Sequence, residues 1–350
     1  MSLNLERVEW HEFFIEDIAK IKSGVRLTKA DMMHGIKPFI GSTDSNNGVT
    51  NFISNSNRSE DSNVLGVNYN GSVVENFYHP YTAIFSDDVK RLSLKHISGN
   101  KYHYLSLKNS ILKQKNKYQY GYKFNEKRLR RQMVMLPSLN ESQPNWQFME
   151  SYTKALMIKK KAKYIDFCRK ELAKLRFKDI EKLEDKDCHE FFLKDIFKIV
   201  QRGKRLTKAN QVEGNYPYVS STALNNGVDN FIGNENGIRM FSNCLTVANS
   251  GSVGSSFYHP YKFVASDHVT HLQNDGFDRF VYLFIATLTN RLSDKYNFNR
   301  EINDKRISRD KIMLPIQNDG NPDFEYMGQY MMNKEYLKRK QYLDYIQSDK

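Results

Sequence analysis

The sequence RLTKA occurs twice in this chain, at residues 26–30 and again at residues 205–209. Other short sequences recur around it in the same order: HEFF at 11–14 and 189–192, NNGV at 46–49 and 225–228, FYHPY at 77–81 and 257–261, and MLP at 135–137 and 313–315. Chance does not preserve the order of so many matches. Because the period is far longer than that of a solenoid repeat, each copy is expected to be a whole domain.

The local texture of each copy predicts strands and loops followed by a helix. Short apolar runs such as NVLGV at 63–67 and NCLTV at 243–247 are bounded by Gly, Asn and Ser, which is typical of short strands. Each copy then passes through Leu-Pro, at 136–137 and 314–315, into a stretch rich in Lys, Glu, Leu, Met and Tyr. That composition favours a helix, and apolar residues recur in it at three- and four-residue steps.

The pattern therefore predicts an α+β chain in which a mixed α/β domain and a long helix alternate. The expected bounds are 1–145 for the first domain, 146–186 for its helix, 187–323 for the second domain and 324–350 for the second helix. Two helices with related apolar seams are expected to pack as an antiparallel coiled coil about a pseudo-twofold axis. Such a helix pair would act as a spacer between the domains.

Composition favours a polyanionic partner. The chain has 350 residues, of which 53 are Lys or Arg and 40 are Asp or Glu, for a net charge of +13. Hydrophobic residues make up 39% and aromatic residues 13%, which is enough apolar material for two cores and argues against disorder. Nucleic acid is the first candidate for the partner, although other soluble basic proteins share this charge balance.

The three cysteines, Cys168, Cys188 and Cys244, are scattered and form no C-x-x-C pair. Their number and spacing argue against a disulfide framework and against a zinc site. The first residues lack the apolar core of a signal peptide, and no apolar run is long enough to span a membrane. We therefore expect a cytoplasmic protein that binds no membrane.

The duplicated chain resembles the specificity (S) subunits of type I restriction-modification systems and the similar short S subunits of type IIB-like systems with fused restriction and methylation. The resemblance is carried by residues 42–49 (STDSNNGV), 221–228 (STALNNGV), 71–73 (GSV) and 249–254 (NSGSVG), and by the duplicated helix. The second helical stretch, from Phe324 to Lys350, is shorter than the one after Trp146 and departs from the pattern of a full-length two-helix spacer. The chain of 350 residues is also shorter than expected for a type I subunit, which favours the type IIB-like group.

The resemblance implies two target-recognition domains, each of which reads one half of a bipartite, asymmetric site in double-stranded DNA. It implies that the helices set the gap between the half-sites and dock methyltransferase (M) subunits or fused restriction-methylation subunits, with a separate restriction or translocase subunit as a further candidate partner. It also implies a non-catalytic subunit that needs no cofactor and no metal. We place the partner-binding surface on the helical seams, at Met149, Tyr152, Leu156, Met327, Tyr330 and Leu337.

Candidate DNA contacts fall into four groups. Phosphate contacts need cations, and base reading needs side chains such as Asn, Ser, Thr and Arg on protruding loops. The basic segments give Arg26, Lys29, Arg205 and Lys208; the neighbours of the Asn-Gly turns give Ser42, Thr43, Asn46, Ser221, Thr222 and Asn225; positions that differ between the copies give Asn68, Asn70, Asn249 and Ser250; and the aromatic-basic segments give Tyr120, Lys123, Phe298 and Arg300. A solvated turn and an ordinary strand remain alternatives for the basic and the aromatic segments.

Catalytic interpretations of the sequence find little support. The segment NYPY at 215–218 resembles the loop with which amino-methyltransferases hold a flipped base, but its counterpart at 36–39 reads IKPF, so the proline marks a shared turn. Asp179 and residues 184–186 (EDK) are expected on a solvated helical face. Cys188-His189 is matched by Trp10-His11, so no cysteine nucleophile is needed there.

His79 and His259 precede prolines within aromatic clusters, and we expect them to be held by packing. The principal alternative function is a free-standing, duplicated nucleic-acid-binding module, such as a repressor or an anti-restriction factor without an enzymatic partner. An independent nuclease is a third interpretation.

Overall fold

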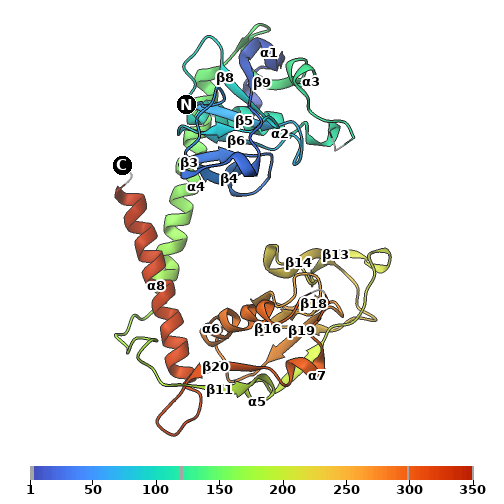
Figure 1. Cartoon of the computed structure of the whole chain (residues 1–350), viewed down its shortest axis with the longest axis vertical. Helices are drawn as coiled ribbons and strands as arrows, with labels where there is room; N and C mark the ends of the chain where they lie inside the picture. Colours follow the sequence, from blue (N-terminus) through green and yellow to red (C-terminus); the bar gives the residue numbers. More distant parts are fainter. Residues whose placement is uncertain (1–3, 119–120, 298, 349–350) are drawn as a thin grey trace. The chain divides into compact units, whose positions relative to one another are not determined.

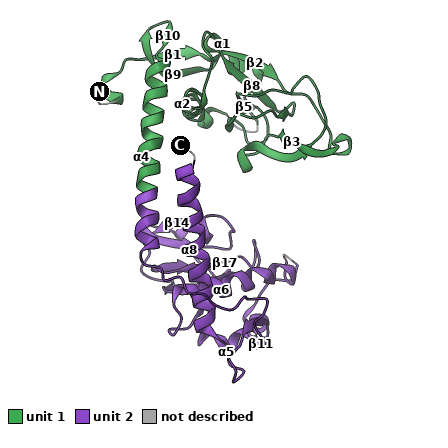
Figure 2. Cartoon of the chain, turned by 90° about the vertical axis from the view of Figure 1, so that its left-hand side faces the viewer, with its two compact units in different colours: residues 1–164 green, residues 165–350 purple. Residues whose placement is uncertain are grey.

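The computed structural model of the chain describes residues 4–118, 121–297 and 299–348. It divides into two compact units, residues 1–164 and residues 165–350 (Figure 2). Each unit contains one copy of the repeat, built from the same succession of strands and helices (Figure 1).

Unit 1 holds three small sheets with the strand orders β2-β8-β5-β6, β4-β3-β7 and β1-β9-β10. All pairings are antiparallel except that of β3 with β7. The strands are β1 Trp10–Phe14, β2 Ala19–Ser23, β3 His34–Ile40, β4 Val49–Ile53, β5 Val64–Asn68, β6 Asn76–His79, β7 Ile84–Phe85, β8 Val89–Leu94, β9 Met133–Asn140 and β10 Gln143–Pro144. The helices are α1 Ile15–Ile18, α2 Lys101–Leu112, α3 Glu126–Arg130 and the first part of α4 Trp146–Leu172.

Unit 2 repeats this plan with the strand orders β12-β19-β16-β17, β14-β13-β18-β15 and β11-β20. Its strands are β11 Cys188–Phe192, β12 Ile199–Arg202, β13 Glu213–Val219, β14 Val228–Ile232, β15 Met240–Phe241, β16 Cys244–Ala248, β17 Ser256–His259, β18 Phe263–Ala265, β19 Val269–Gln273 and β20 Lys311–Pro315. Its helices are α5 Leu193–Ile196, α6 Arg279–Thr289, α7 Asp304–Ile307 and α8 Phe324–Ser348. The fold class predicted from the sequence, two tandem mixed α/β domains with long helices, is confirmed.

Strand register confirms that the two units are copies of one domain. In unit 1, β1 pairs with β9 so that Trp10 faces Pro137, and in unit 2 β11 pairs with β20 so that Cys188 faces Pro315. Because a slip of one residue would turn every side chain to the opposite face, this shared register preserves which residues are buried.

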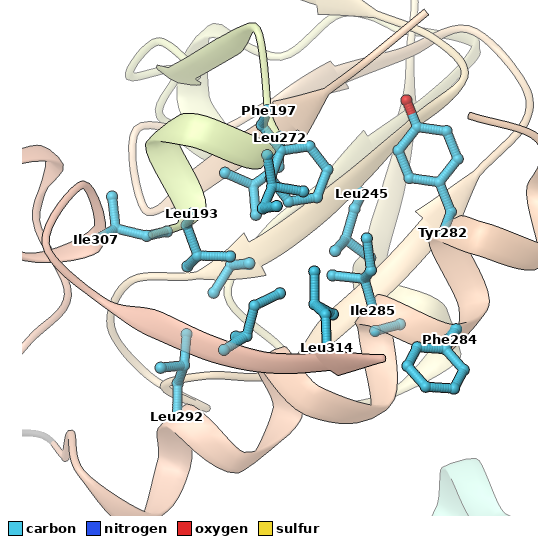
Figure 3. Close-up of a cluster of buried hydrophobic side chains, with 14 of the residues drawn as sticks. Leu193, Phe197, Leu245, Leu272, Tyr282, Phe284, Ile285, Leu292, Ile307 and Leu314 are labelled. Atoms are coloured by element: carbon cyan, nitrogen blue, oxygen red, sulfur yellow. The ribbon is translucent and has the colours of Figure 1, made fainter. Parts of the chain in front are cut away.

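The core of each unit lies between its antiparallel sheet and one helix. All five residues of β5 are buried, and so are all five of β16, as expected for a strand covered on both faces. In unit 2 the core gathers Leu245, Leu272, Tyr282, Ile285 and Leu314 (Figure 3). A side-chain cap begins each core helix, because Asn100 accepts backbone N–H bonds at the start of α2 and Asp278 does so at the start of α6.

The chain leaves the first long helix earlier than predicted. The expectation was helix from 146 to 186, but α4 ends at Leu172, and the chain then runs without helical structure until β11. Residues from α8 explain this difference. The amide of Asn333 donates to the carbonyl of Lys178 at 2.7 Å and accepts its N–H at 3.2 Å, while Gln329 donates to the carbonyl of Arg176 at 2.8 Å. These side chains satisfy backbone groups that a helix would otherwise bond internally.

The antiparallel sense of the predicted helix pair is present within unit 2. The Arg339 guanidinium lies 5.3 Å from the centre of the Phe167 ring, whereas further along the chain the carbonyl of Glu181 accepts from the Tyr326 hydroxyl at 2.9 Å. Only residues up to Leu172 form a helix there, so the remaining contact with α8 is made by a non-helical segment. The second long helix begins at Phe324, where the sequence placed it.

His79 and His259 are packed structural residues, as the sequence predicted. Both side chains are 0% exposed, and each ring nitrogen Nδ1 lies near the hydroxyl of the tyrosine two residues later, at 3.3 Å for Tyr81 and 3.2 Å for Tyr261. Burial lowers the pKa of each imidazole to about 4. Both rings are therefore neutral near pH 7.

This burial makes the stability of unit 1 depend on pH. Between pH 6.5 and about 4 the unfolded chain takes up a proton at His79 that the folded unit does not, so stability falls as the pH falls through this window. Each such histidine contributes at most about 1.4 kcal/mol per pH unit. The two tryptophans, Trp10 and Trp146, both lie in unit 1, so urea unfolding followed by their fluorescence reports on that unit.

We expect His79→Gln to reduce the slope of unfolding free energy against pH by about 1 kcal/mol per pH unit between pH 6.5 and 4.5. His259→Gln is the matched control, because it lies in unit 2 and should leave this fluorescence-monitored slope unchanged. Equal slopes in the wild type and the His79→Gln variant would show that burial does not hold His79 neutral.

Candidate nucleic-acid interface

The basic segment of each unit starts where two backbones come into close contact. A Cβ atom at Gly24 would lie 1.9 Å from the carbonyl oxygen of Ser86, and one at Gly203 would lie 2.2 Å from that of Ala265. The Gly24 amide donates to Val89 at 3.1 Å, which anchors the segment to the start of β8. Only glycine fits this approach, so the cations that follow leave the sheet at the same place in both units.

The predicted phosphate contacts lie on the surface in both units. Arg26, Lys29, Arg205 and Lys208 are all exposed. None of their side chains makes a hydrogen bond or an ion pair to another residue of the described ranges. By contrast, Lys37 on the neighbouring strand β3 is paired with Glu60 at 2.7 Å. The four cations are therefore available for an external anion, which a cation engaged in an internal pair is not.

The Asn-Asn-Gly sequences form left-handed turns, as their residue types predicted. Asn46, Asn47 and Gly48 have φ values of 49°, 54° and 79°, and their counterparts at 225–227 have φ values of 50°, 55° and 77°. Asn and Gly tolerate this region of backbone space better than other residues do. Asn46 and Asn225 are exposed at the start of the turns.

A second loop joins this turn in each unit. Gly71 and Gly251 have φ values of 57° and 58°. A Cβ atom at Gly71 would lie 2.5 Å from the carbonyl oxygen of Ser42, and one at Gly251 would lie 2.8 Å from the carbonyl oxygen of Ser221. The Ser42 hydroxyl also donates to the carbonyl of Asn70. In unit 2 the amide of Ser252 donates to the carbonyl of Ser221 at 2.9 Å. The structure thus brings residues 42–48 and 68–74, and their counterparts, into one loop cluster per unit.

Two predicted base-reading residues need correction. Asn68 and Asn249 are each 1% exposed, so their side chains brace the loops from inside. The Asn68 amide donates to the carbonyl of Thr43 at 2.9 Å, and Asn249 accepts from the Thr270 hydroxyl at 2.9 Å. Ser250, at 7% exposed, is also largely buried. The hydroxyls of Thr43 and Thr222 accept backbone amides within their own turns, at 3.2 and 3.1 Å.

The aromatic-basic segments form stacks of rings and cations. In unit 1, Tyr118 stacks on Tyr122 with centroids 5.7 Å apart, and the Arg128 guanidinium lies 3.6 Å from the centre of the Tyr122 ring. In unit 2, the exposed Arg300 lies over Tyr296 at 5.4 Å. Lys123 is half-buried, while Tyr120 and Phe298 lie outside the described residues.

In unit 2 the aromatic-basic segment adjoins the loop cluster. The amide of Ile302 donates to the carbonyl of Asn249 at 3.0 Å, which ties the end of the aromatic-basic segment to the second loop. In unit 2, three predicted groups of residues that are far apart in the sequence are therefore joined by backbone contacts.

Sequence reasoning missed two residues of the loop clusters, Asp88 and His268. Asp88 accepts from the Asn70 amide at 3.1 Å, and His268 is bonded through Nδ1 to the Ser250 hydroxyl at 2.7 Å. Burial and the charge of Asp88 raise the pKa of the neighbouring Tyr69. The available signal was the difference between the two copies, because the aspartate at position 88 is replaced by a histidine at position 268.

Exposed aromatic side chains beside the cations were also missed. Phe52 and Phe231 occupy matching positions in β4 and β14 and are 51% and 54% exposed. In unit 2, Phe231 and Lys208 line the same surface hollow. The repeated sequence NFI was the available signal, but its phenylalanine resembles any strand residue until burial is known.

The helical seams divide into core and surface positions. Met149 and Met327 are 1% and 0% exposed and belong to the cores of their units, which corrects their assignment to a partner-binding surface. Tyr330 is half-buried, with its ring edge against Phe284 at 5.9 Å. Leu156 and Leu337 remain exposed, at 39% and 49%.

Unit 1 carries an apolar groove along α4. Tyr152 and Leu156 line it together with Trp10, Met157 and residues of α2, and its volume is about 360 Å³. In unit 2 the chain itself contacts α8 through Lys178 and Glu181, whose backbone carbonyls accept from Asn333 and Tyr326.

The titratable groups of the described residues form no evident catalytic set. No group of three or more His, Cys, Asp or Glu residues is placed to hold a metal ion within those ranges. Burial raises the pKa of Cys188 and raises that of Cys244 to about 12, the opposite of what a thiolate nucleophile requires. Among the described helices, none combines the length and the apolar character that crossing a bilayer demands.

Comparison with solved structures supports the fold. The type I restriction-modification S subunit from M. genitalium aligns over 100% of this chain and 94% of its own, with a TM-score of 0.52 at 16% identity. The HsdS subunit from Thermoanaerobacter tengcongensis aligns over 97% of this chain and 91% of its own at 13% identity, but its TM-score of 0.33 is too low to add to the argument.

Sequence comparison gives closer relationships. The specificity subunit S.BcgI of a type II restriction enzyme from Heyndrickxia coagulans is 58% identical over 149 residues, which cover 43% of this chain and 44% of that protein. The match therefore spans less than half of the relative's length. The family model for the type I restriction modification DNA specificity domain matches twice, at residues 7–164 and 185–342. These two matches take in most of the chain, and the chain belongs to the family of type I restriction-modification DNA specificity domains.

Proposed function

We propose that this chain is the specificity subunit of a restriction-modification enzyme and that each unit reads one half of a bipartite, asymmetric site in double-stranded DNA. One observation carries the proposal. The same loop cluster and the same exposed cations occur in both units, while polar side chains on the loops differ between the copies. Identical cations suit the common DNA backbone, and different loop side chains suit two different half-sites on one duplex.

The shared part suits the DNA backbone. Arg26, Lys29, Arg205 and Lys208 are exposed and have no internal partner in the described ranges, and the net charge of +13 favours a polyanion. Contacts to phosphates position a protein on DNA without reading its sequence. Residues that are identical in both units are therefore assigned to this role.

The differing part suits base recognition. Asn70 in unit 1 corresponds to Ser250 in unit 2, and Lys123 corresponds to Glu301, which reverses the charge at the end of the aromatic-basic segment. Arg300, which corresponds to Tyr122, adds a further hydrogen-bonding group, whereas Ser42 and Asn46 are shared with Ser221 and Asn225 and belong to the common part. Target-recognition domains at 1–145 and 187–323 follow from this assignment.

The partner is proposed to be a methyltransferase subunit or a fused restriction-methylation subunit, with a separate restriction or translocase subunit as a further candidate. The exposed groove along α4 supports this, because contiguous apolar surface on a soluble protein favours docking of another chain. We assign the chemistry to the partner, since no catalytic set was found among the described side chains. An enzyme that acts on cellular DNA would work in the cytoplasm.

The primary test is methylation mapping by single-molecule sequencing of DNA from cells that express this chain with its methyltransferase. A split motif with two unlike halves, absent when the methyltransferase is expressed alone, is the expected result. If an active methyltransferase gave no methylation that depends on this chain, a free-standing nucleic-acid-binding module would replace the proposal.

The phosphate contacts are tested by Lys29→Ala combined with Lys208→Ala. Binding should weaken on cognate and unrelated duplexes alike, and the slope of log affinity against log salt should become shallower by about 2, because each lost phosphate contact removes roughly 0.9. Fluorescence anisotropy across a salt series measures both quantities on the assembled enzyme. Lys37→Ala is the control, since its ammonium is paired with Glu60 and should contribute little. A loss confined to one base position would contradict a phosphate role.

The docking groove is tested by Leu156→Asp. A carboxylate placed in an apolar contact loses its hydration without gaining a partner, so we expect at least a tenfold weaker association with the methyltransferase subunit. Co-purification and sedimentation measure the association. Ile158→Asp is the matched control, because Ile158 is 60% exposed on the same helix and does not line the groove. Equal effects of the two substitutions would argue against the groove as the docking site.

A further inference from the structure

One side-chain pair changes its chemistry between the two loop clusters while its place in the fold is kept. In unit 1, Asn70 donates to the carboxylate of Asp88 at 3.1 Å. In unit 2, Ser250 at the matching position is bonded to the imidazole of His268 at 2.7 Å. Asn70 and Ser250 directly precede Gly71 and Gly251, the glycines that pack on the neighbouring loop.

The backbone around this pair is the same in both units. The amide of Tyr69 donates to the carbonyl of Asp88 at 3.0 Å, and the amide of Asn249 donates to that of His268 at 2.8 Å. The two copies therefore present different side chains from one backbone frame, so the chemical difference is not a consequence of a different loop shape.

The residues behind the pair have changed together, which keeps that frame intact. In unit 1 the Lys90 ammonium lies 4.7 Å from the centre of the Tyr69 ring, whereas in unit 2 the Thr270 hydroxyl donates to Asn249 at 2.9 Å. Asp87 and Asp267, which immediately precede the second member of each pair, are identical. The aspartate at 87 and 267 is therefore an unchanged neighbour with which the changed residue, Asp88 or His268, can be compared.

The loop cluster also holds polar atoms without partners. The amide oxygen of Asn70 and the amide nitrogen of Asn249 are both buried and make no hydrogen bond to any described residue. Buried polar groups in native structures are nearly always paired, and both units leave one such group unpaired in the same loop.

We propose that Asp88, held by Asn70, and His268, held by Ser250, are specificity-determining residues that make the two units read different bases. This inference rests on the proposed function and deepens it by naming the side chains that discriminate. An ionised carboxylate can only accept hydrogen bonds, and phosphates repel it. Beside DNA it is favourable only opposite an amino donor, so the half-site of unit 1 should contain cytosine or adenine there.

The imidazole of His268 offers a different set of groups. The ring is exposed and its Nδ1 is engaged with Ser250, which leaves Nε2 on the free side. In the tautomer in which the serine hydroxyl donates to Nδ1, Nε2 carries the ring proton and can donate to the oxygen or nitrogen acceptors of guanine or to thymine O4. The two units would thus recognise complementary donor and acceptor patterns.

The test exchanges the pairs between units in the full chain, assembled with its methyltransferase, and maps methylation by single-molecule sequencing. Asn70→Ser with Asp88→His should change the motif at one position of one half-site only. Ser250→Asn with His268→Asp should change one position of the other half-site only. Because a good base contact discriminates by about 10- to 100-fold, the change in preference should be of that size.

Asp87→Asn is the matched control, since this aspartate is shared by both units, and its motif should equal that of the wild type. An unchanged motif in both exchange variants would overturn the inference and leave the proposed function standing. A wild-type enzyme without any bipartite motif would instead remove the proposed function itself.

A variant that loses methylation is resolved by binding. Fluorescence anisotropy is measured for the assembled, folded variant on duplexes that carry each of the four bases at every position of the affected half-site. A shifted base preference at one position supports the inference. A uniform loss for all bases, with an unchanged melting temperature, overturns it, because the pair would then serve only the general affinity for DNA.

Discussion

The contact between two loops, made by Ser42 with Gly71 and repeated by Ser221 with Gly251, is the constraint on which the proposed recognition surface depends. A side chain at either glycine would collide with the serine carbonyl, at 2.5 or 2.8 Å, and both glycines have left-handed backbones. With this contact in place, the Asn-Asn-Gly turn and the end of the central strand form one rigid cluster. The basic segment is fixed nearby by a second glycine approach at Gly24 and Gly203.

Duplication followed by local divergence explains how one fold can serve two targets. The residues that hold the frame, such as the glycines and the buried His79 and His259, are the same in both units. The residues that differ include Asn70 and Ser250 on the loop clusters and, behind them, Lys90 and Thr270. Loops carried on a conserved frame can vary in sequence while the frame is kept.

The connection between the units shows how side chains set the end of a helix. Residues 173–187 contain no Gly or Pro and have a helical composition, yet they form no helix, and Arg176, Lys178 and Glu181 contact α8. Asn333, which is 8% exposed, satisfies both backbone groups of Lys178, and Leu183 packs against the core of unit 2.

The sequence by itself determined the duplication, the alternation of domain and helix, the start of α8 at Phe324 and the left-handed Asn-Gly turns, because these follow from repeated motifs and local propensity. It also identified the exposed cations, since Arg26 and Lys29 recur in both copies. Only the tertiary structure decided that Asn68, Asn249, Met149 and Met327 are buried, that α4 stops at Leu172, and that Asp88 and His268 join the loop clusters. Those outcomes depend on contacts between residues far apart in the chain, such as Asn333 with Lys178, which periodicity and composition do not encode.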